Sequence, residues 1–154
     1  DDDPSNADVY GNLYNWYAVD DERGICPENF HVPSDEEFMT LEMFLGMSES
    51  EANSTGYRGT NEGSKLAGNA DLWNSGNLEQ NSEFGTSGFA ALPAAYRVYS
   101  SGNYIDMGSF GSFWSSTDNV SSNAWRRELY SSSSEIFRSG DDKHYGFSVR
   151  CLVD

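Results

Sequence analysis

The chain has 154 residues and a formal net charge of −16 at pH 7, with 9 Lys and Arg against 25 Asp and Glu. Its length is that of one ordinary domain, and 14% aromatic against 22% charged residues favours a packed core over disorder. The negative charge repels nucleic acid and anionic membranes, so we expect neither as a partner. Residues 85–154 are nearly neutral, with 7 acidic and 6 basic side chains, and a neutral surface rich in Ser and Tyr suits ligand contact.

The N-terminal part of the chain predicts a short tail followed by an extended segment. Residues 1–8 are polar, and we expect a linker or the processed remnant of a longer protein, which leaves one domain over residues 9–154. Residues 9–19 are rich in aromatic side chains, which is typical of a strand or the edge of a hairpin.

One helix is predicted over residues 35–45. Ser34 and Glu37 have the spacing of a capping box, in which each side chain bonds the backbone amide of the other residue. Gly46 is placed to end the helix. The apolar side chains expected on its core-facing side are Phe38, Leu41, Phe44 and Leu45.

The rest of the chain predicts long loops and then short strands. Residues 46–88 are rich in Gly, Asn and Ser, and only Lys65, Leu66 and Ala67 indicate a short second helix. β-prone runs and alternation of apolar and polar residues then predict antiparallel strands over residues 113–117, 124–130, 136–138 and 146–153. We therefore expect an α+β domain, with one or two helices packed on small antiparallel sheets.

No catalytic motif is present in the sequence, which lacks a Gly-x-Ser-x-Gly elbow, a phosphate-binding loop and a His-Glu-x-x-His motif. His31 precedes the predicted helix and is interpreted as structural, since an acid–base histidine needs an ordered partner. The carboxylate runs at 20–22, 35–37 and 141–142 are interpreted as solvated turns and caps. A structural calcium ion bound by such carboxylates is the alternative left open.

The two cysteines, Cys26 and Cys151, are too few for a four-cysteine zinc site. They form either two free thiols or one bridge. A bridge would close a long loop, stabilise the fold by about 4–5 kcal/mol in the chain-entropy model and require an oxidising compartment.

Residues 121–145 have the composition of a binding surface. Ser131 to Ser134 lie between two predicted strands, and Trp125, Leu129 and Ile136 have the spacing of core anchors, as does Phe147 in the last strand. We therefore expect an ordered backbone that displays small polar and aromatic residues over positions 126–144 to solvent, as antigen-binding loops do. An ordinary polar hairpin is the alternative.

Five segments give the sequence a resemblance to a known family. They are residues 14–19 (YNWYAV), 26–35 (CPENFHVPSD), 88–97 (GFAALPAAYR), 113–117 (FWSST) and 145–151 (YGFSVRC), and they resemble the blocks of the Fibrobacter succinogenes major paralogous domain. The resemblance implies a C-type lectin-like fold, related to formylglycine-generating enzymes, in a non-enzymatic binding domain. It also implies an extracellular or cell-surface protein, secreted or lipid-anchored, or a virion protein.

Some family members resemble the variable proteins of diversity-generating retroelements, whose C-terminal segment is mutated at adenines. Asn codons mutated in this way give Ser, Tyr, Asp, His, Phe, Gly or Arg, so Trp125, Glu128, Lys143 and Arg150 are expected to be scaffold residues. The expected ligand contacts, within a variable surface of about residues 110–145, are Arg126, Tyr130, Ser132, Ser133, Phe137, Ser139, Gly140, Asp141, Asp142 and His144.

The resemblance also bears on the cysteines and the ligand. Cys26 and Cys151 fall in the first β segment and the final strand, and chain ends pair in this fold, so we expect a disulfide. The expected ligand is a protein or glycan on a cell or phage surface, bound without a cofactor. A carbohydrate-binding module, calcium-assisted or not, is the alternative, although the Glu-Pro-Asn and Trp-Asn-Asp motifs of calcium-dependent lectins are absent. A sulfatase-modifying enzyme is disfavoured because the catalytic cysteine pair has no counterpart.

Overall fold

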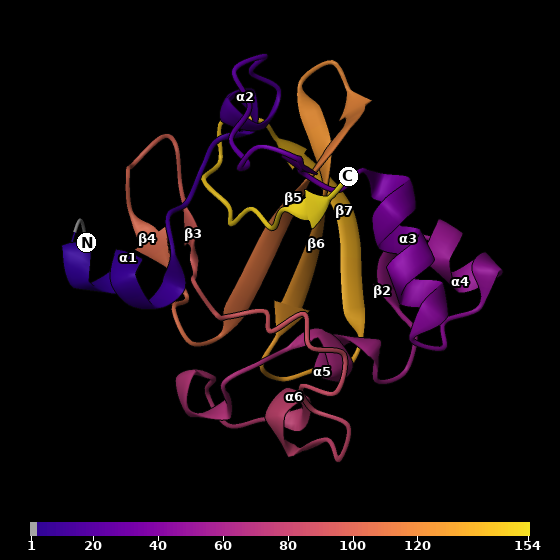
Figure 1. Ribbon diagram of the computed structural model, residues 1–154. Coiled ribbons are helices and arrows are strands. Elements are labelled where there is room, and N and C mark those ends of the chain that lie inside the picture. The colour runs from indigo at the N-terminus through magenta and orange to yellow at the C-terminus, as the bar shows by residue number, and fades with distance from the viewer. Residues whose placement is uncertain (1–2) are drawn as a thin grey trace.

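The computed structural model describes residues 3–154, and its centre is a four-stranded antiparallel sheet with the strand order β2-β7-β6-β5 (Figure 1). The strands are β2 (Gly56–Arg58), β5 (Phe110–Val120), β6 (Asn123–Tyr130) and β7 (Ile136–Asp142). They contain three of the four strands predicted from the sequence, which are thereby confirmed.

The register of the central strands gives the sheet two different faces. Arg127 of β6 lies opposite Arg138 of β7, and Glu128 lies opposite Phe137. Neighbouring side chains along a strand point to opposite faces, so these two pairs lie on different sides of the sheet. Arg127 and Arg138 both bond Asp35 of helix α3, and we call their side the helix-covered face. The side of Glu128 and Phe137 is called the aromatic face.

Helix α3 (Asp35–Phe44) confirms the predicted helix and its cap. The Glu37 amide donates to Ser34 Oγ at 3.2 Å, and the Ser34 amide donates to the Glu37 carboxylate at 2.8 Å. These reciprocal bonds satisfy amides that a helix start otherwise leaves without partners.

The predicted apolar side of α3 is wrong at its C-terminal end. Phe38 is 2% exposed, as expected, but Phe44 is 86% exposed. Glu42 is buried instead, because Arg58 and Arg127 reach its carboxylate and pair with it. A helical pattern of apolar residues does not reveal that an arginine from another strand will bury a glutamate.

Short helices replace much of the long loop predicted between α3 and the central strands. They are α4 (Glu49–Asn53), α5 (Glu62–Leu66), the 3-10 helix η1 (Ala70–Leu72) and α6 (Asn77–Gln80). α5 confirms the second helix expected at Lys65 and Leu66. α5 and α6 lie at the end of the sheet where β6 turns into β7 (Figure 1). The amides of Ser64 and Leu78 bond the carbonyls of Ser134 and Ser131 in this turn.

The N-terminal segment is helical where a strand was predicted. Helices α1 (Pro4–Tyr10) and α2 (Trp16–Val19) replace the strand expected over residues 9–19, and α1 begins within the expected linker. The side chains of Asp3 and Asn15 cap these helices. The two caps supply local bonds that favour helical turns over an extended chain.

The strand predicted over residues 146–153 is mostly wrong. Only β8 (Leu152–Val153) forms, and it pairs with β1 (Phe30–His31). Gly146, Phe147 and Ser148 each make a single bridge to a different segment of the chain. No continuous ladder can form when three successive residues have three different partners.

Cys26 and Cys151 form the expected disulfide, with their Cα atoms 5.7 Å apart. Cys151 directly precedes β8, so the bridge lies beside the β1–β8 pair. The two ends of the domain are therefore joined both covalently and by backbone bonds.

Each face of the central sheet has its own apolar cluster. The helix-covered face packs Phe38, Leu66, Phe113, Leu129 and Ile136. The aromatic face packs Trp16, Trp114, Ala124 and Phe147. The predicted anchors Leu129, Ile136 and Phe147 are buried, as expected. Trp125 is only half-buried, and its ring lies against the Arg138 guanidinium at 3.9 Å.

A third sheet is the hairpin of β3 (Tyr96–Arg97) and β4 (Tyr104–Ile105), which lies beside α1 (Figure 1). The class is therefore α+β with small antiparallel sheets, as predicted. None of the helices in the described part of the chain is long and apolar enough to cross a membrane.

Candidate ligand-binding surface

Aromatic rings form a continuous band that begins on the aromatic face and continues over the β3–β4 hairpin, helix α2 and the residues after β7. Nine of the described residues contribute a ring, and successive ring centroids are at most 6.3 Å apart. We call them the aromatic band: Tyr57, Phe137, Tyr130, Phe110, Tyr96, Tyr145, Tyr99, His144 and Tyr17. Tyr57 and Tyr99 are each 49% exposed and Tyr17 is 47% exposed. The band thus offers aromatic surface to solvent on a framework of paired strands.

Strand register explains how one end of the band forms. Tyr57 of β2 lies directly opposite Phe137 of β7, and Phe110 of β5 lies opposite Tyr130 of β6. Residues opposite each other in antiparallel strands point to the same face. The ring centroids are accordingly 5.0 Å apart in the first pair and 4.5 Å in the second.

Arg126 lies beneath this band and is buried, which corrects its predicted role as an exposed ligand contact. Its guanidinium pairs with Glu128, and with Asp141 at 3.0 Å. It also lies 5.7 Å from the Phe137 ring and 5.2 Å from the Phe147 ring. Arg126 therefore neutralises the carboxylates and supports rings that reach the surface.

Tyr130 is held inside the band by its neighbours. Burial raises the pKa of Tyr130 to about 12, and the nearby hydroxyl of Tyr57 acts in the same direction, whereas Arg126 opposes it. The Tyr130 hydroxyl is therefore protonated at neutral pH.

Five of the ten predicted contacts lie on the aromatic face: Arg126, Tyr130, Phe137, Ser139 and Asp141. Phe137, which was expected to be exposed, is half-buried between Tyr57 and Tyr130. Ser139 lies opposite Arg126 and is half-buried beside it.

The other five predicted contacts lie elsewhere. Ser132 and Ser133 form the turn between β6 and β7, where only Ser132 is exposed. Gly140 lies opposite Trp125 on the other face, and a Cβ there would come within 1.9 Å of Asn119 Nδ2. A side chain at this position would require Asn119 to move.

Asp142 and His144 lie at the far end of the band. The Asp142 carboxylate accepts from the His144 amide at 2.9 Å and lies 2.7 Å from its Nδ1. The bond from the His144 amide, followed by that from its ring, lowers the pKa of Asp142. The His144 ring lies 5.1 Å from Tyr17 and 5.4 Å from Tyr99.

Positions 126–144 therefore do not form the uniformly exposed surface that was predicted. The strands are ordered, but Arg127 and Arg138 point into the helix-covered face and are buried. Lys143, expected to be scaffold, is 6% exposed, pairs with Asp118 and lies 4.1 Å from the Trp16 ring. Both faces of the sheet are covered along much of their length, which alternation in sequence cannot show.

One carboxylate run was misinterpreted as solvated. Asp35 is 6% exposed and pairs with Arg127 at 2.6 Å and with Arg138 at 2.5 Å. Burial alone would raise the pKa of Asp35, but the two arginines outweigh it and hold the pKa below its ordinary value. Among residues 3–154, no group of three or more His, Cys, Asp or Glu is placed to hold a metal ion.

His31 has two ordered carboxylate partners. Its Nδ1 lies 2.7 Å from Asp154 and its Nε2 lies 2.9 Å from Glu37. The hydrogen bonds to Asp154 and then Glu37 raise the pKa of His31. The sequence indicated no ordered partner for His31, whereas the structure supplies two, and they connect the chain's last residue to helix α3.

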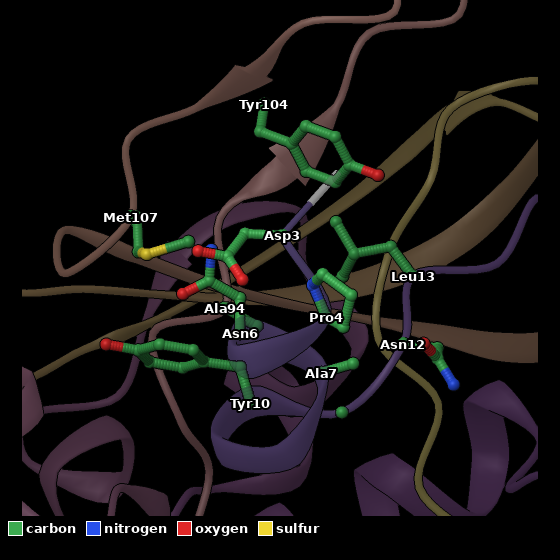
Figure 2. A pocket seen from close by; sticks show the side chains of 11 residues that line it. Asp3, Pro4, Asn6, Ala7, Tyr10, Asn12, Leu13, Ala94, Tyr104 and Met107 are labelled. Carbon is green, nitrogen blue, oxygen red and sulfur yellow. The ribbon is translucent and has the colours of Figure 1, made fainter. Parts of the chain in front are cut away.

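A hollow of about 210 Å³ lies between α1 and the β3–β4 hairpin (Figure 2). Figure 2 shows Asp3 between Tyr10 of α1 and Tyr104 of β4, with Met107 at one side. The Asp3 carboxylate already accepts from the amide and hydroxyl of Ser5. This hollow therefore offers no charged group that is not already engaged in capping a helix.

Comparison with protein families gives a match over residues 1–152 to the Fibrobacter succinogenes major domain. The chain belongs to this family. No curated protein and no solved structure matches it. In this family member, the segment of residues 113–117 lies within β5, and residues 145–147 contribute Tyr145 to the aromatic band.

Six of the nine band residues were not among the ligand contacts predicted from the sequence. Tyr17, Tyr57, Tyr96, Tyr99, Phe110 and Tyr145 come from separate elements and loops of the fold. Tyr57 carried no local signal, because only its pairing with β7 places it next to Phe137. Their shared feature in the sequence is aromatic character, which also describes core residues.

Proposed function

We propose that this domain is a non-enzymatic binding module that recognises a protein or cell-surface ligand through its aromatic band. The observation that carries the proposal is the chain of partly exposed rings that begins on the central sheet. Tyr, in particular, supplies large contact area with a polar hydroxyl at little entropic cost. Paired strands hold five of the nine rings in place, which reduces the entropy lost on binding.

The charged groups near the band favour binding over catalysis. Arg126 is paired with Glu128 and Asp141, and His144 is paired with Asp142. Side chains that are already paired in this way can make polar contacts with a ligand, but they are poorly placed to act as a catalytic acid or base. The Tyr130 hydroxyl, with its pKa raised to about 12 by burial, is a donor rather than a base at neutral pH.

Within the α+β class, the fold that we propose for this family member is the C-type lectin-like fold of the formylglycine-generating-enzyme type. Pairing of β1 with β8, and the adjacent disulfide, agree with the joined chain ends expected of that fold. The disulfide also supports an extracellular or cell-surface location, because such bridges persist in oxidising compartments.

Retroelement diversification is part of the same proposal. Tyr130, Phe137, Ser139 and Asp141 share the aromatic face, and His144 lies in the band, so five of the ten expected variable positions gather there. The test is the genome around the coding sequence. A nearby reverse transcriptase and a template repeat for residues 110–154, differing at adenines, would support it; a template whose differences fall at Glu128 or Lys143 would contradict it.

Binding is tested on an array of glycans and purified bacterial surface proteins. The double variant Tyr57→Ala/Phe137→Ala removes two band rings, and Met43→Ala/Phe44→Ala removes exposed apolar side chains from α3 as the matched control. We expect the first variant to lose at least about tenfold in affinity for any bound spot, since buried aromatic contacts dominate interfaces. Equal binding by both variants would place the site elsewhere.

A carbohydrate ligand is the second candidate, because exposed Tyr57, Tyr99 and Tyr17 can also stack on sugar rings. The same array distinguishes a carbohydrate ligand from a protein ligand. Signal confined to glycans would favour the sugar, and its loss with a chelator would indicate calcium assistance.

A further inference from the structure

A second candidate site lies beside helix α3, in a groove that shares no residue with the aromatic band. It has a volume of about 300 Å³, at the lower end for small-molecule pockets. Its mainly apolar lining includes Pro33, Phe38, Leu41, Phe89 and Leu152. The disulfide forms part of the same wall through Cys151.

Arg150 brings an unbalanced positive charge to this groove. Of the nine Lys and Arg, all except Arg97 and Arg150 pair with a carboxylate within residues 3–154. Arg97 is exposed to water, whereas Arg150 is half-buried. A cation in a chain of charge −16 has many potential partners, so a half-buried arginine without one is unusual here.

The guanidinium of Arg150 has contacts within the protein, but not all of its N–H donors have a hydrogen-bond acceptor. Its Nη2 donates to the Ala90 carbonyl at 3.1 Å, and its central carbon lies 5.1 Å from the Phe89 ring. Its Nε is buried and has no partner within the described residues. Burial also lowers the pKa of Arg150, although the group stays protonated. Because Nε is closed to solvent, an acceptor supplied by a ligand would bond the terminal nitrogens, of which Nη2 already has a protein partner.

The backbone beside Arg150 adopts a rare conformation to make this arrangement. Ala90 has a φ of 54°, in the left-handed region that non-glycine residues seldom occupy. Gly68 lies so close that a Cβ there would be 2.6 Å from the Ala90 Cα. Strain of this kind is characteristic of ligand-contacting segments.

Glu37 is the other ionised group that lines the groove. Its carboxylate accepts from the amide and hydroxyl of Ser34 and lies 2.9 Å from His31 Nε2. The bond from the Ser34 amide is the main cause that lowers the pKa of Glu37, so the group is ionised and already bonded. The Ser34 donors and His31 offset part of the Glu37 charge, which opposes a bound anion, so an anion's attraction to this groove depends on Arg150.

We propose that this groove binds a small carboxylic acid with an apolar chain. The chain would pack on Phe38, Leu41 and Phe89, and the carboxylate would pair with the terminal nitrogens of the Arg150 guanidinium. The protein's overall negative charge opposes anions at long range, but ions at physiological strength screen it beyond about 8 Å. The local cation and the apolar walls therefore decide the specificity.

The test uses three probes in a nuclear magnetic resonance titration of the whole chain, followed through backbone amide shifts. Sodium octanoate has both chain and charge, octan-1-ol has the chain alone, and sodium acetate has the charge alone. We expect octanoate to shift Leu41, Phe89 and Leu152, with a Kd on the order of 1 mM or tighter for a ligand of this size. Octanol should bind at least about tenfold more weakly, since a hydrogen-bonded charge is lost.

Two variants address the groove in different ways. Arg150→Gln removes the cation and should weaken octanoate about tenfold or more, while leaving octanol unchanged. Leu41→Trp fills the groove from α3 without touching Arg150 and should abolish binding of both, so a failure of Arg150→Gln to fold would not end the test. Arg97→Gln and Met43→Trp are the matched controls, and both should bind octanoate normally.

The proposal is overturned if octanoate causes no shifts up to about 10 mM, far above the expected Kd. Equal affinity for octanol overturns the role of Arg150. Binding of a tripeptide ending in Leu, with none of octanoate, overturns the assignment to a small acid in favour of a chain terminus. The band variant Tyr57→Ala/Phe137→Ala should bind octanoate normally, which keeps this test independent of the proposed function.

Discussion

The two faces of the central sheet bury charge in different ways. On the helix-covered face, Arg58, Arg127 and Arg138 share Asp35 and Glu42, and the side chains of Glu42 and Arg58 are 0% exposed. On the aromatic face Arg126 shares Glu128 and Asp141, and the Asp141 side chain is 30% exposed.

This difference decides which face can change its side chains. A fully buried ion network leaves an unpaired charge whenever one member is removed, and that is severely destabilising. The aromatic face instead surrounds its one network with rings and small polar groups that reach water, such as Tyr57 and Ser139. Replacing such residues removes contact area without stranding a buried charge. Replacement of Tyr57 or Ser139 should therefore cost less stability than replacement of a member of the network under α3.

The largest expected effect comes from breaking the network under α3. Glu42→Ala should lower the free energy of unfolding by about 3–5 kcal/mol, because Arg58 and Arg127 would lose a buried partner. Urea unfolding followed by tryptophan fluorescence measures it. Glu36→Ala, at an exposed position of the same helix, is the control and should cost less than about 1 kcal/mol. Similar losses for the two variants would mean that the network does not distinguish this face.

The two faces should also respond at opposite ends of the pH scale. Arg138 and Arg127 lower the pKa of Asp35 against its burial, so its contribution is present above its ordinary pKa of 3.8 and lost as the pH falls through the lowered value. Burial raises the pKa of Tyr130 from 10.0 to about 12, so its contribution is present below pH 10 and lost as the pH rises through about 12.

Two variants isolate these contributions from those of other ionisable groups. Asp35→Asn should reduce the loss of stability in acid relative to the unmodified protein, and Tyr130→Phe should reduce the loss in alkali. Thermal melting as a function of pH measures both. Unchanged pH profiles in both variants would show that neither group differs between the folded and unfolded states.

Local features of the fold were predictable from the sequence because they depend on neighbours in the chain. Helix α3 follows from Ser34 and Glu37, three residues apart, and strands β5 to β7 follow from β-prone runs and alternation. The helices α1 and α2 were missed because single caps, at Asp3 and Asn15, compete with an aromatic composition typical of strands. Prediction of the disulfide depended on the resemblance to the family, because the sequence alone was equally consistent with two free thiols.

The site was predictable only in part, for a related reason. The resemblance to variable proteins of retroelements identified Tyr130 and Phe137, but the ring pairs with Phe110 and Tyr57 depend on strand register. Likewise, Arg126 looked like a surface residue because nothing nearby in the chain shows that Asp141 and Glu128 bury it. The aromatic band depends on contacts between residues that are far apart in the sequence, and these contacts could not be predicted from the sequence alone.

A smaller effect is expected at the start of α3, the helix that creates the difference between the faces. Ser34→Ala removes the hydroxyl that accepts the Glu37 amide and should cost about 0.5–2 kcal/mol in unfolding free energy. Ser48 makes an equivalent cap on α4, so Ser48→Ala is a matched comparison away from the central sheet. A loss at Ser34 well above that range would indicate that the cap also positions Asp35 in its ion pairs.

The smallest effect, and the sharpest comparison, is expected at Ser139. It directly follows Arg138 on β7, yet its side chain lies on the aromatic face and donates to the neighbouring Gly140 carbonyl. Ser139→Ala should therefore change the free energy of unfolding by no more than about 0.5 kcal/mol, the usual range for a substitution away from buried networks. Arg138 lies on the other side, bonded to Asp35 and to the carbonyls of Asn53 and Ser54. Arg138→Ala should cost several-fold more, because it leaves Asp35 with one arginine instead of two. Urea unfolding of the two variants side by side measures this difference in stability. Comparable losses of unfolding free energy would show that the aromatic face is as constrained as the helix-covered face. Such a face would be a poor place for variable ligand contacts.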